Sequence, residues 1–274
     1  MRLYHFFYLL LLLIPLNLRA QKAVEINDTN EEHIFTFGEI KILEDSTNQL
    51  DFNRVKKLDS LFKSNLRSTP QNPSLNYTYW YKIKLQGNNR SKNSWILEFF
   101  DQTIDEITVY IPNEKEEYEV FKGGDKLKFA DRQYKHKNFA FKINHSLKEQ
   151  VIYIKIKSNQ IADIIIVLRS IGRFVKYALS EYFVFGLFYG MILIFSFYNL
   201  VMFLAVRRIQ YFYYVLYNLS VGLYEISIDG LAYQYLWPNS PNWNQYSFGV
   251  AIYMISIFSL LFSKKLLHVK VKAP

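Results

Sequence analysis

Hydrophobic and polar residues alternate in six short stretches between residues 79 and 168. Within 79–85, Tyr81, Ile83 and Leu85 fall on one face and Trp80 on the other, so one of the two faces is expected to form the core. Alternation of this kind is typical of half-buried β-strands, whose side chains point to opposite faces in turn. The predicted strands are 79–85, 94–100, 106–111, 138–143, 150–157 and 164–168.

Turn-forming residues separate these strands. Clusters rich in Gly, Asn, Asp or Pro occur at 87–89, 112–114, 123–125 and 144–146, and such residues favour tight turns. Short strands at this spacing predict an antiparallel β-sandwich, which we place at residues 21–178. Before the strands, hydrophobic residues recur every three or four positions over 51–66 and predict one helix.

The amino terminus is hydrophobic without alternation. Residues 6–13 form an apolar run that follows Arg2 and precedes Ala20, an order typical of an export signal that is cleaved after a small residue. A retained membrane anchor is the alternative, but the run is shorter than the roughly 20 residues that a span needs. Residues 1–20 are therefore predicted to be a signal peptide.

Three hydrophobic segments in the last third of the chain are predicted to span a membrane. Residues 182–206 contain no charged side chain over 25 positions, which is long enough to cross a hydrocarbon core of roughly 30 Å. The remaining predicted segments are a second span at 211–228, an aromatic outer loop at 229–246, a third span at 247–263 and a basic cytoplasmic tail at 264–274.

The charges beside these segments predict their orientation. Residues 21–180 carry 25 Lys and Arg against 21 Asp and Glu, whereas the rest of the chain carries 8 against 3. The second excess includes basic pairs at 207–208 and 264–265, which directly follow hydrophobic segments. Because basic residues in short loops favour the cytoplasmic side, the β-sandwich and the loop 229–246 are expected outside the cytoplasm.

Candidate catalytic chemistry is sparse. The chain has no cysteine, which excludes disulfides and Cys-ligated metals, and no two of its five histidines have metal-ligand spacing on one element. Asp101 and the pair Asp105–Glu106 resemble glycosidase carboxylates, but carboxylates that border turns are commonplace. No basic stripe interleaved with aromatic residues indicates nucleic-acid binding. We therefore expect no metal, no cofactor and no nucleic-acid partner.

Aromatic residues are better candidates for recognition, because rings offer apolar faces to a ligand such as a sugar. The ligand-binding candidates are Tyr79, Trp80, Trp95, Tyr110, Arg132 and Tyr134. For the aromatic residues the alternative is a place in the core or on a sheet face, and for Arg132 it is a salt bridge to Asp125 or Asp131.

Glu225 and Asp229 share a helix face in the second span. Ionisable residues at membrane depth are functional candidates, and a hydrated position at the headgroups is the alternative.

Several runs in the membrane segment resemble one known family, the bacterial seven-transmembrane receptors with diverse intracellular signalling modules. They are 185–191, 197–200, 211–217, 222–224 and, most specifically, the run Asp-Gly-Leu-Ala-Tyr-Gln-Tyr-Leu-Trp-Pro at 229–238. The exported segment is similar to that family's second type of extracellular domain at 42–45, 79–81, 95–98, 107–110, 124–132 and 138–141. The resemblance implies a jelly-roll sensor similar to carbohydrate-binding modules, seven helices, and a cytoplasmic output such as a histidine kinase or a diguanylate cyclase. With three predicted spans and no output domain, the chain is expected to be truncated.

These observations predict a receptor of the bacterial inner membrane. Its β-sandwich is expected to bind an extracytoplasmic ligand, with a carbohydrate as the first candidate, and a short linker at 179–181 to pass the signal to the helices. The expected partners are the lipid bilayer, this ligand and a cytoplasmic signalling module, and a homodimer is left open. The chain itself is expected not to be an enzyme. Two alternatives stay open: the N-terminal part of a membrane sensor enzyme, and a membrane-anchored structural or transport-associated binding protein.

Overall fold

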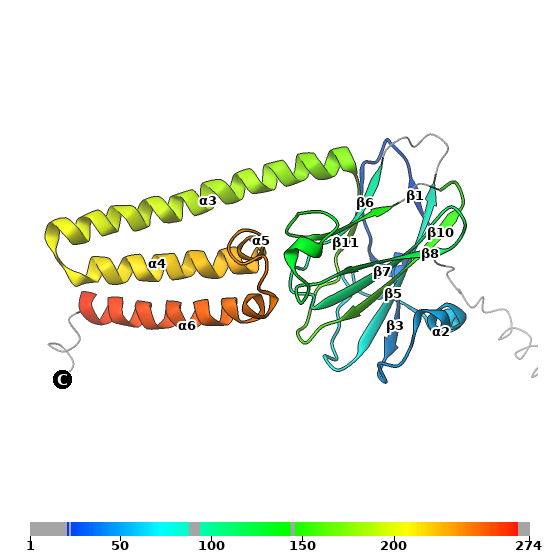
Figure 1. Ribbon diagram of the computed structural model, residues 1–274, viewed down its shortest axis with the longest axis horizontal. Helices are drawn as coiled ribbons and strands as arrows, with labels where there is room; N and C mark the ends of the chain where they lie inside the picture. Colours follow the sequence, from blue (N-terminus) through cyan, green and yellow to red (C-terminus); the bar gives the residue numbers. More distant parts are fainter. Residues whose placement is uncertain (1–20, 22, 88–93, 144–145, 268–274) are drawn as a thin grey trace, which may run out of the picture.

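The computed structural model describes residues 21, 23–87, 94–143 and 146–267. The predicted signal peptide at 1–20 and the part of the basic tail after residue 267 lie outside these residues. Within them, a domain of two β-sheets precedes a group of helices, and the domain sits at one end of that group (Figure 1).

The domain is a β-sandwich, as the alternating pattern predicted. Seven strands form one sheet in the order β4-β3-β5-β10-β7-β8, with β1 pairing to β5 in parallel, and four form the other in the order β2-β11-β6-β9. The strands of the first sheet are β1 (Val24–Ile26), β3 (Lys41–Asp45), β4 (Lys63–Ser64), β5 (Thr78–Gly87), β7 (Glu106–Pro112), β8 (Tyr118–Gly123) and β10 (Glu149–Lys157). Those of the second are β2 (Glu32–Ile34), β6 (Trp95–Phe99), β9 (Phe139–Ile143) and β11 (Ile166–Ser170).

Both faces of β5 are buried, although the pattern predicted a single core face. Tyr81, Ile83 and Leu85 point between the sheets and belong to the main core. Trp80 points the other way and is also fully buried, in a second cluster that includes Val55. The second cluster exists because α2 (Phe52–Lys57) covers part of the outer face of the seven-stranded sheet.

The predicted helix over 51–66 is too long. Asp51 caps α2 by accepting a hydrogen bond from Arg54 N, the helix ends before Leu58, and a single 3₁₀ turn, η2 (Asp59–Leu61), follows. The chain then becomes strand β4, which pairs with Lys41 and Ile42 of β3. The end of the predicted segment thus pairs with the edge of the sheet instead of forming the last helical turns that its hydrophobic pattern suggested. The other 3₁₀ turns are η1 (Phe37–Glu39) and η3 (Phe129–Asp131).

A single helix, α3 (Ile171–Val206), leaves the sandwich without a linker. Ser170 ends β11 and caps α3, because its side chain accepts a hydrogen bond from Arg173 N. The expected linker at 179–181 is therefore wrong, since these residues are helical, and the last strand ends before residue 178. At 1.5 Å per residue α3 is roughly 54 Å long, well beyond a hydrocarbon core of roughly 30 Å.

Three further helices follow α3: α4 (Ile209–Ile228), α5 (Leu231–Tyr235) and α6 (Pro241–Leu266). Helix α4 runs back toward the sandwich beside α3, and α6 runs away from the sandwich again beside α4 (Figure 1). The predicted outer loop at 229–246 contains α5 and the start of α6. By length and composition, two helices of the described chain could cross a membrane, α3 and α6. The Tyr-rich α4, which the sequence predicted as a span, does not meet that criterion.

Small and polar residues bring α3 and α4 together. A Cβ atom on Gly222 would lie 3.1 Å from Cγ2 of Ile192 in α3. Asn218 Nδ2 donates hydrogen bonds to the Ile192 carbonyl oxygen at 3.0 Å and to Ser196 Oγ at 2.8 Å. Small residues and interhelical hydrogen bonds are typical of helices that associate in lipid.

Candidate functional site

The candidate functional site is the junction between the β-sandwich and the helices. The sandwich meets the start of α3, the turn between α4 and α5, and the start of α6 (Figure 1). Three groups of polar contacts hold this junction, and the loop that precedes β9 contributes to the first two.

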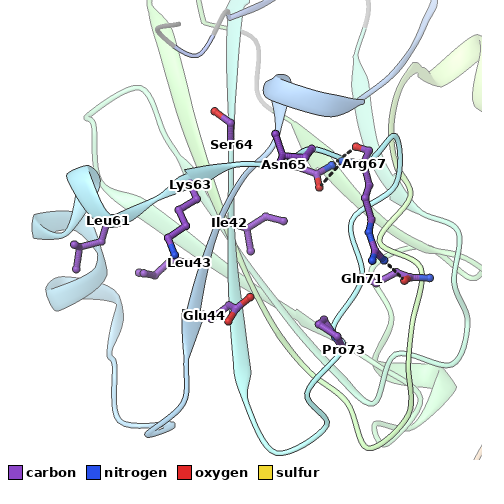
Figure 2. Close-up of a pocket in the computed structure, with 11 residues that line it drawn as sticks. Ile42, Leu43, Glu44, Leu61, Lys63, Ser64, Asn65, Arg67, Gln71 and Pro73 are labelled. Carbon is purple, nitrogen blue, oxygen red and sulfur yellow. Dashed lines mark hydrogen bonds between the residues drawn. The ribbon is translucent and has the colours of Figure 1, made fainter. Parts of the chain in front are cut away.

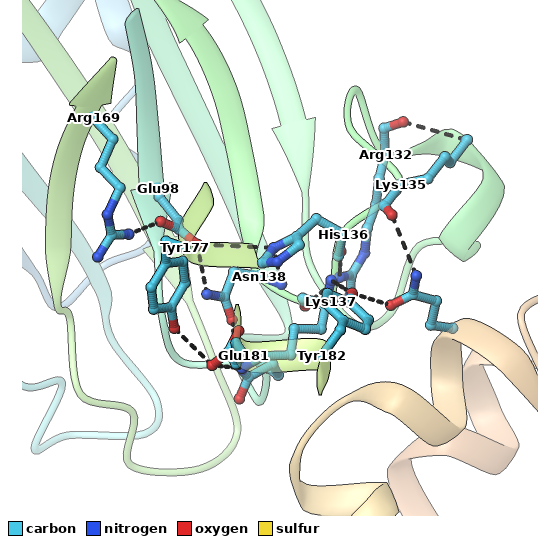
Figure 3. Close-up of polar contacts among 12 residues, drawn as sticks. Glu98, Arg132, Lys135, His136, Lys137, Asn138, Arg169, Tyr177, Glu181 and Tyr182 are labelled. Atoms are coloured by element: carbon cyan, nitrogen blue, oxygen red, sulfur yellow. Dashed lines mark hydrogen bonds and ion pairs between the residues drawn. The ribbon is translucent and has the colours of Figure 1, made fainter. Parts of the chain in front are cut away.

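The first group surrounds Glu98 of β6, which has no exposed surface. Arg169 of β11 donates to one carboxylate oxygen of Glu98, and Asn138 Nδ2 donates to the other at 2.6 Å (Figure 3). Burial raises the pKa of Glu98, although Asn138 and Arg169 oppose that rise. Glu32 Oε2 then joins Arg169 Nε at 2.9 Å to Arg173 Nε of α3 at 3.0 Å. The first turn of α3 is thereby ion-paired to the four-stranded sheet.

The second group links the loop before β9 to α3 and α5. Lys137 Nζ lies 3.0 Å from Glu181 Oε1, which also accepts a hydrogen bond from the Tyr177 hydroxyl at 2.6 Å. The Tyr182 hydroxyl donates to Gln234 Oε1 of α5 at 2.6 Å and accepts from Lys137 N at 3.3 Å (Figure 3). Tyr182 thus joins two helices and the sandwich at one point.

Arg132 stabilises the same loop from inside. Its guanidinium donates to the carbonyl oxygens of His136 at 2.9 Å and Lys137 at 2.6 Å. It also lies 4.4 Å from the centre of the Phe139 ring and 5.7 Å from that of Tyr233 in α5. Burial lowers the pKa of Arg132 to about 10, so it stays charged at neutral pH. In the described part of the chain its partners are carbonyls and rings, which replace the salt bridge considered from the sequence.

The third group is a carboxylate pair at the start of α6. Gln245 Nε2 of α6 donates to Asp125 Oδ1 at 2.7 Å and to Asp105 Oδ1 at 3.1 Å. Burial and the nearby Asp105 carboxylate raise the pKa of Asp125 to about 8. Lys126 Nζ pairs with Asp105 Oδ2 at 2.8 Å. Gly124 permits this turn, because it has a φ of +130° and a Cβ there would lie 2.1 Å from the Asp105 carbonyl oxygen.

The sequence-predicted ligand residues do not lie together. Tyr79, Trp80 and Trp95 are at most 1% exposed, so none presents a ring face to solvent. Tyr110 is half-buried on the outer face of the seven-stranded sheet, where its ring stacks on Phe52 at 4.1 Å. Two candidates belong to the junction, Arg132 and Tyr134, whose ring lies 6.1 Å from that of Phe174 in α3.

The carboxylates singled out in the sequence have structural partners. Asp229 ends α4 and accepts a hydrogen bond from the Tyr189 hydroxyl of α3, while the Glu225 carbonyl oxygen accepts from Asp229 N. Asp101 accepts hydrogen bonds from the backbone nitrogens of Thr103 and Asp163, both at 2.8 Å. Asp229 therefore joins two helices, and Asp101 orders turns.

The described residues of the sandwich line at least two hollows. The first has a volume of about 580 Å³ and lies beside β3 and β4, where the hydrogen-bonded pair Arg67 and Gln71 forms part of its wall (Figure 2). The second has a volume of about 520 Å³ and lies on the outer face of the seven-stranded sheet, with Tyr110 among its lining residues. Neither hollow includes the junction residues Arg132 or Tyr134.

Comparisons with known proteins agree with the division of the chain into a β-sandwich and a group of helices. The family model described as 7TMR-DISM extracellular 2 matches residues 38–170, and the one described as 7TM diverse intracellular signalling matches residues 181–273. No curated protein sequence matches the chain.

Two solved structures are weakly similar to the chain. One is a beta-glucuronidase of an uncultured Clostridium species, with 10% identity and a TM-score of 0.30 over 55% of this chain and 31% of that one. The other is the enzymatically active domain of tailspike protein 4 of bacteriophage CBA120, with 8% identity and a TM-score of 0.24 over 52% and 20%. The matched part thus spans less than a third of either structure.

Proposed function

This chain belongs to the seven-transmembrane receptors with diverse intracellular signalling modules, and from that premise we propose that its β-sandwich binds a small extracytoplasmic ligand and passes the change through the junction to its helices. The proposal places the chain in the bacterial inner membrane as a multi-pass protein, with residues 1–20 as its signal peptide and α4 as a span. The signal would end in a cytoplasmic output module, such as a kinase or a cyclase, and the sandwich and helices would be sensory parts without catalysis of their own.

The direct passage of β11 into α3 is the observation that carries this proposal. Arg169 and Ser170 close the strand, and Ile171 opens a helix that is 36 residues long. Because no flexible residue intervenes, a shift of β11 in the sandwich displaces α3 as a rigid rod. A ligand that favours one position of β11 would bias the packing of the helices by its differential affinity for the two states.

The junction offers a second point of contact for such a shift. The sandwich also touches α5 through Tyr233 and α6 through Gln245. A change in the sandwich therefore acts on α3 relative to α6, which suits a transition between two packings of one helix bundle.

Distance measurements between labelled helices test the proposal. The chain has no cysteine, so Leu179→Cys in α3 and Trp243→Cys in α6 introduce the sole labelling sites for paired spin labels. The full chain in lipid nanodiscs is titrated with a panel of neutral and acidic oligosaccharides, with calorimetry to identify those that bind. We expect a bound ligand to shift the label-to-label distance, while a control pair within the sandwich, Lys57→Cys and Lys115→Cys, stays unchanged. Tight binding with no shift would contradict transmission.

A further inference from the structure

The second hollow of the sandwich has the charge and shape of a binding site for an anion. We name it the lysine groove, and define it by Thr108, Tyr110, Lys122, Lys126, Lys155 and Lys157. It lies on the part of the outer sheet face that α2 leaves uncovered. Its volume of about 520 Å³ falls in the usual range of small-molecule sites, roughly 300–1,000 Å³.

Strand register places these side chains in one row. Lys155 of β10 pairs with Thr108 of β7, which pairs with Lys122 of β8. Directly opposite residues of neighbouring strands have Cβ atoms about 5 Å apart, so the two lysines flank Thr108 on a single face. In the next row, Tyr110 lies between Tyr153 and Val120, and its half-buried ring closes that side of the groove.

The groove has few negative charges of its own. Glu106 is the acidic residue among its lining side chains, against four lysines. Lys126 pairs with the buried Asp105, and Lys155 Nζ lies 5.5 Å from the centre of the Trp80 ring. Lys122 and Lys157 are exposed, and no ion pair within 4 Å is found for either in the part of the chain that the structure describes. Glu106 is the residue directly opposite Lys157, so Lys122 and Lys155 lie farther from its negative charge. Clefts lined by one sign of charge attract ligands of the other sign.

We propose that the lysine groove binds an acidic oligosaccharide. Its carboxylates would pair with Lys122, Lys155 and Lys157, and its hydroxyls would bond to the polar side chains of Thr108 and Asn48, which also line the groove. This inference rests on the proposed receptor function and supplies the class of its ligand. Neutral sugars are disfavoured, because they would leave the clustered ammonium groups without partners.

The groove also reaches the junction. Lys126 lines the groove and binds Asp105, whose other carboxylate oxygen accepts from Gln245 of α6. Leu127 lines it as well, and its carbonyl oxygen accepts the Tyr233 hydroxyl of α5. An anion that competes with Asp105 for Lys126 therefore changes the charge that faces α6. The groove is therefore connected to α6 through Asp105 and to α5 by a direct hydrogen bond.

Binding of a charged sugar and its neutral ester by the full chain tests the groove. Trigalacturonate and fully methyl-esterified trigalacturonate have the same sugar skeleton and differ in charge. The chain is held in nanodiscs of zwitterionic lipid, and affinity is measured by calorimetry at low and high salt. We expect the acid to bind at least about tenfold more tightly than the ester, because three ion pairs at the protein surface each contribute modestly. High salt should weaken binding of the acid.

Two triple variants locate the site. Lys122→Gln, Lys155→Gln and Lys157→Gln together should weaken trigalacturonate binding at least about tenfold. The control replaces Lys57, Lys63 and Lys115 by Gln, which are exposed lysines outside the groove, and should leave affinity unchanged. Thermal unfolding checks that both variants fold. Single replacements of the exposed Lys122 and Lys157 provide the same comparison if the triple variant is unstable.

Several outcomes would overturn the proposal. They are equal affinity for acid and ester, equal loss in the two triple variants, and no binding of the acid. Failure of the receptor function looks different. If the acid binds in the groove and the α3–α6 distance does not change, the groove proposal is supported and the transmission proposal is contradicted. If another ligand shifts that distance by the same amount in the groove variant as in the wild type, the transmission proposal is supported and the groove proposal is contradicted.

Discussion

The two sides of the junction differ in how their carboxylates are neutralised. On the α3 side, Glu98 and Glu32 face Arg169 and Arg173, so each buried or half-buried carboxylate has a cation. On the α6 side, Asp105 pairs with Lys126, whereas the described structure shows no ion pair for Asp125, which shares the neutral amide of Gln245 with Asp105. Breaking the first set leaves a charge buried without its partner, which is costly. The second set is destabilised when Asp125 loses its proton, because the buried charge then lies beside the Asp105 carboxylate. The α3 side is therefore the fixed anchor, and the α6 side is the contact that can release.

The largest effect should come from removing the anchor's central carboxylate. Glu98→Ala removes the buried partner of Arg169, which is 4% exposed and keeps Glu32 as its other carboxylate. We expect a loss of about 1.5–3 kcal/mol in the free energy of unfolding, the cost of a hydrogen bond to a charged group. Thermal and denaturant unfolding of the full chain in nanodiscs measures it. Glu116→Gln is the matched control, because Glu116 pairs with Lys148 on the exposed surface and should leave stability nearly unchanged. Equal effects of the two changes would refute the anchor.

A smaller effect is expected at the turn between α4 and α5. Gly230 has a φ of +75°, and a Cβ there would lie 2.9 Å from Cγ of Gln102 in the sandwich. Gly230→Ala should cost about 1–2 kcal/mol from the left-handed backbone alone, and the contact with Gln102 adds to that cost by pushing α5 away from the sandwich. Proteolysis of the loop before β9 should accelerate. Gly249→Ala, on α6 with open space around it, is the control, and comparable proteolysis in both variants would contradict the close approach.

The α6 side should also respond to pH. The pKa of Asp125 in the folded protein is about 8, against an ordinary value of 3.8, so the folded state holds the proton more tightly than the unfolded chain. The resulting stabilisation is complete below about pH 4 and is lost as pH rises through about 8. Between pH 6 and 9 we expect stability to fall by at least about 1.4 kcal/mol, the equivalent of one pKa unit.

Asp125→Asn keeps the shape of the side chain without its charge. This variant should lose that pH dependence and exceed the wild type in stability at pH 9, as measured by unfolding across the pH range. Asp131→Asn is the control, because Asp131 is exposed in the loop nearby. A wild-type curve that stays flat from pH 6 to 9 would rule out Asp125 as the titrating group.

The strands with the clearest alternation were predicted from the sequence, and strands at the sheet edges were not. All six predicted strands are present as β5, β6, β7, β9, β10 and β11, because their period-two pattern reflects a buried face. Strand β8 was missed, since it lies at the sheet edge and Gly123 alone of its residues is buried. The helix over 51–66 was overextended because a hydrophobic period does not indicate where pairing with a distant strand begins.

The junction was harder to predict because its partners are far apart in the sequence. Asp125 and Gln245 are 120 positions apart, and Glu98 and Arg169 are 71 apart. Residue type alone also did not separate a ring in the core, such as Trp95, from one on an open face, such as Tyr110. One usable signal was present: Glu98 interrupts the apolar strand β6, and a charge in a buried strand requires a partner.

The smallest predicted effect concerns the residue that touches both sides. Tyr182 on α3 donates its hydroxyl proton to Gln234 of α5, so it joins the fixed anchor to the helices on the releasable side. Tyr182→Phe keeps the ring and removes this hydrogen bond, which should cost about 0.5–1.5 kcal/mol. The control is Tyr198→Phe, a replacement on the same helix at a residue that is 60% exposed.

If Tyr182 couples the two sides, its replacement should widen the distribution of α3–α6 distances between spin labels at neutral pH. It should have less effect at pH 9, where repulsion between the Asp105 and Asp125 carboxylates already destabilises the α6 side. A distribution that is as narrow as in the wild type at both pH values would show that the two sides hold the helices independently.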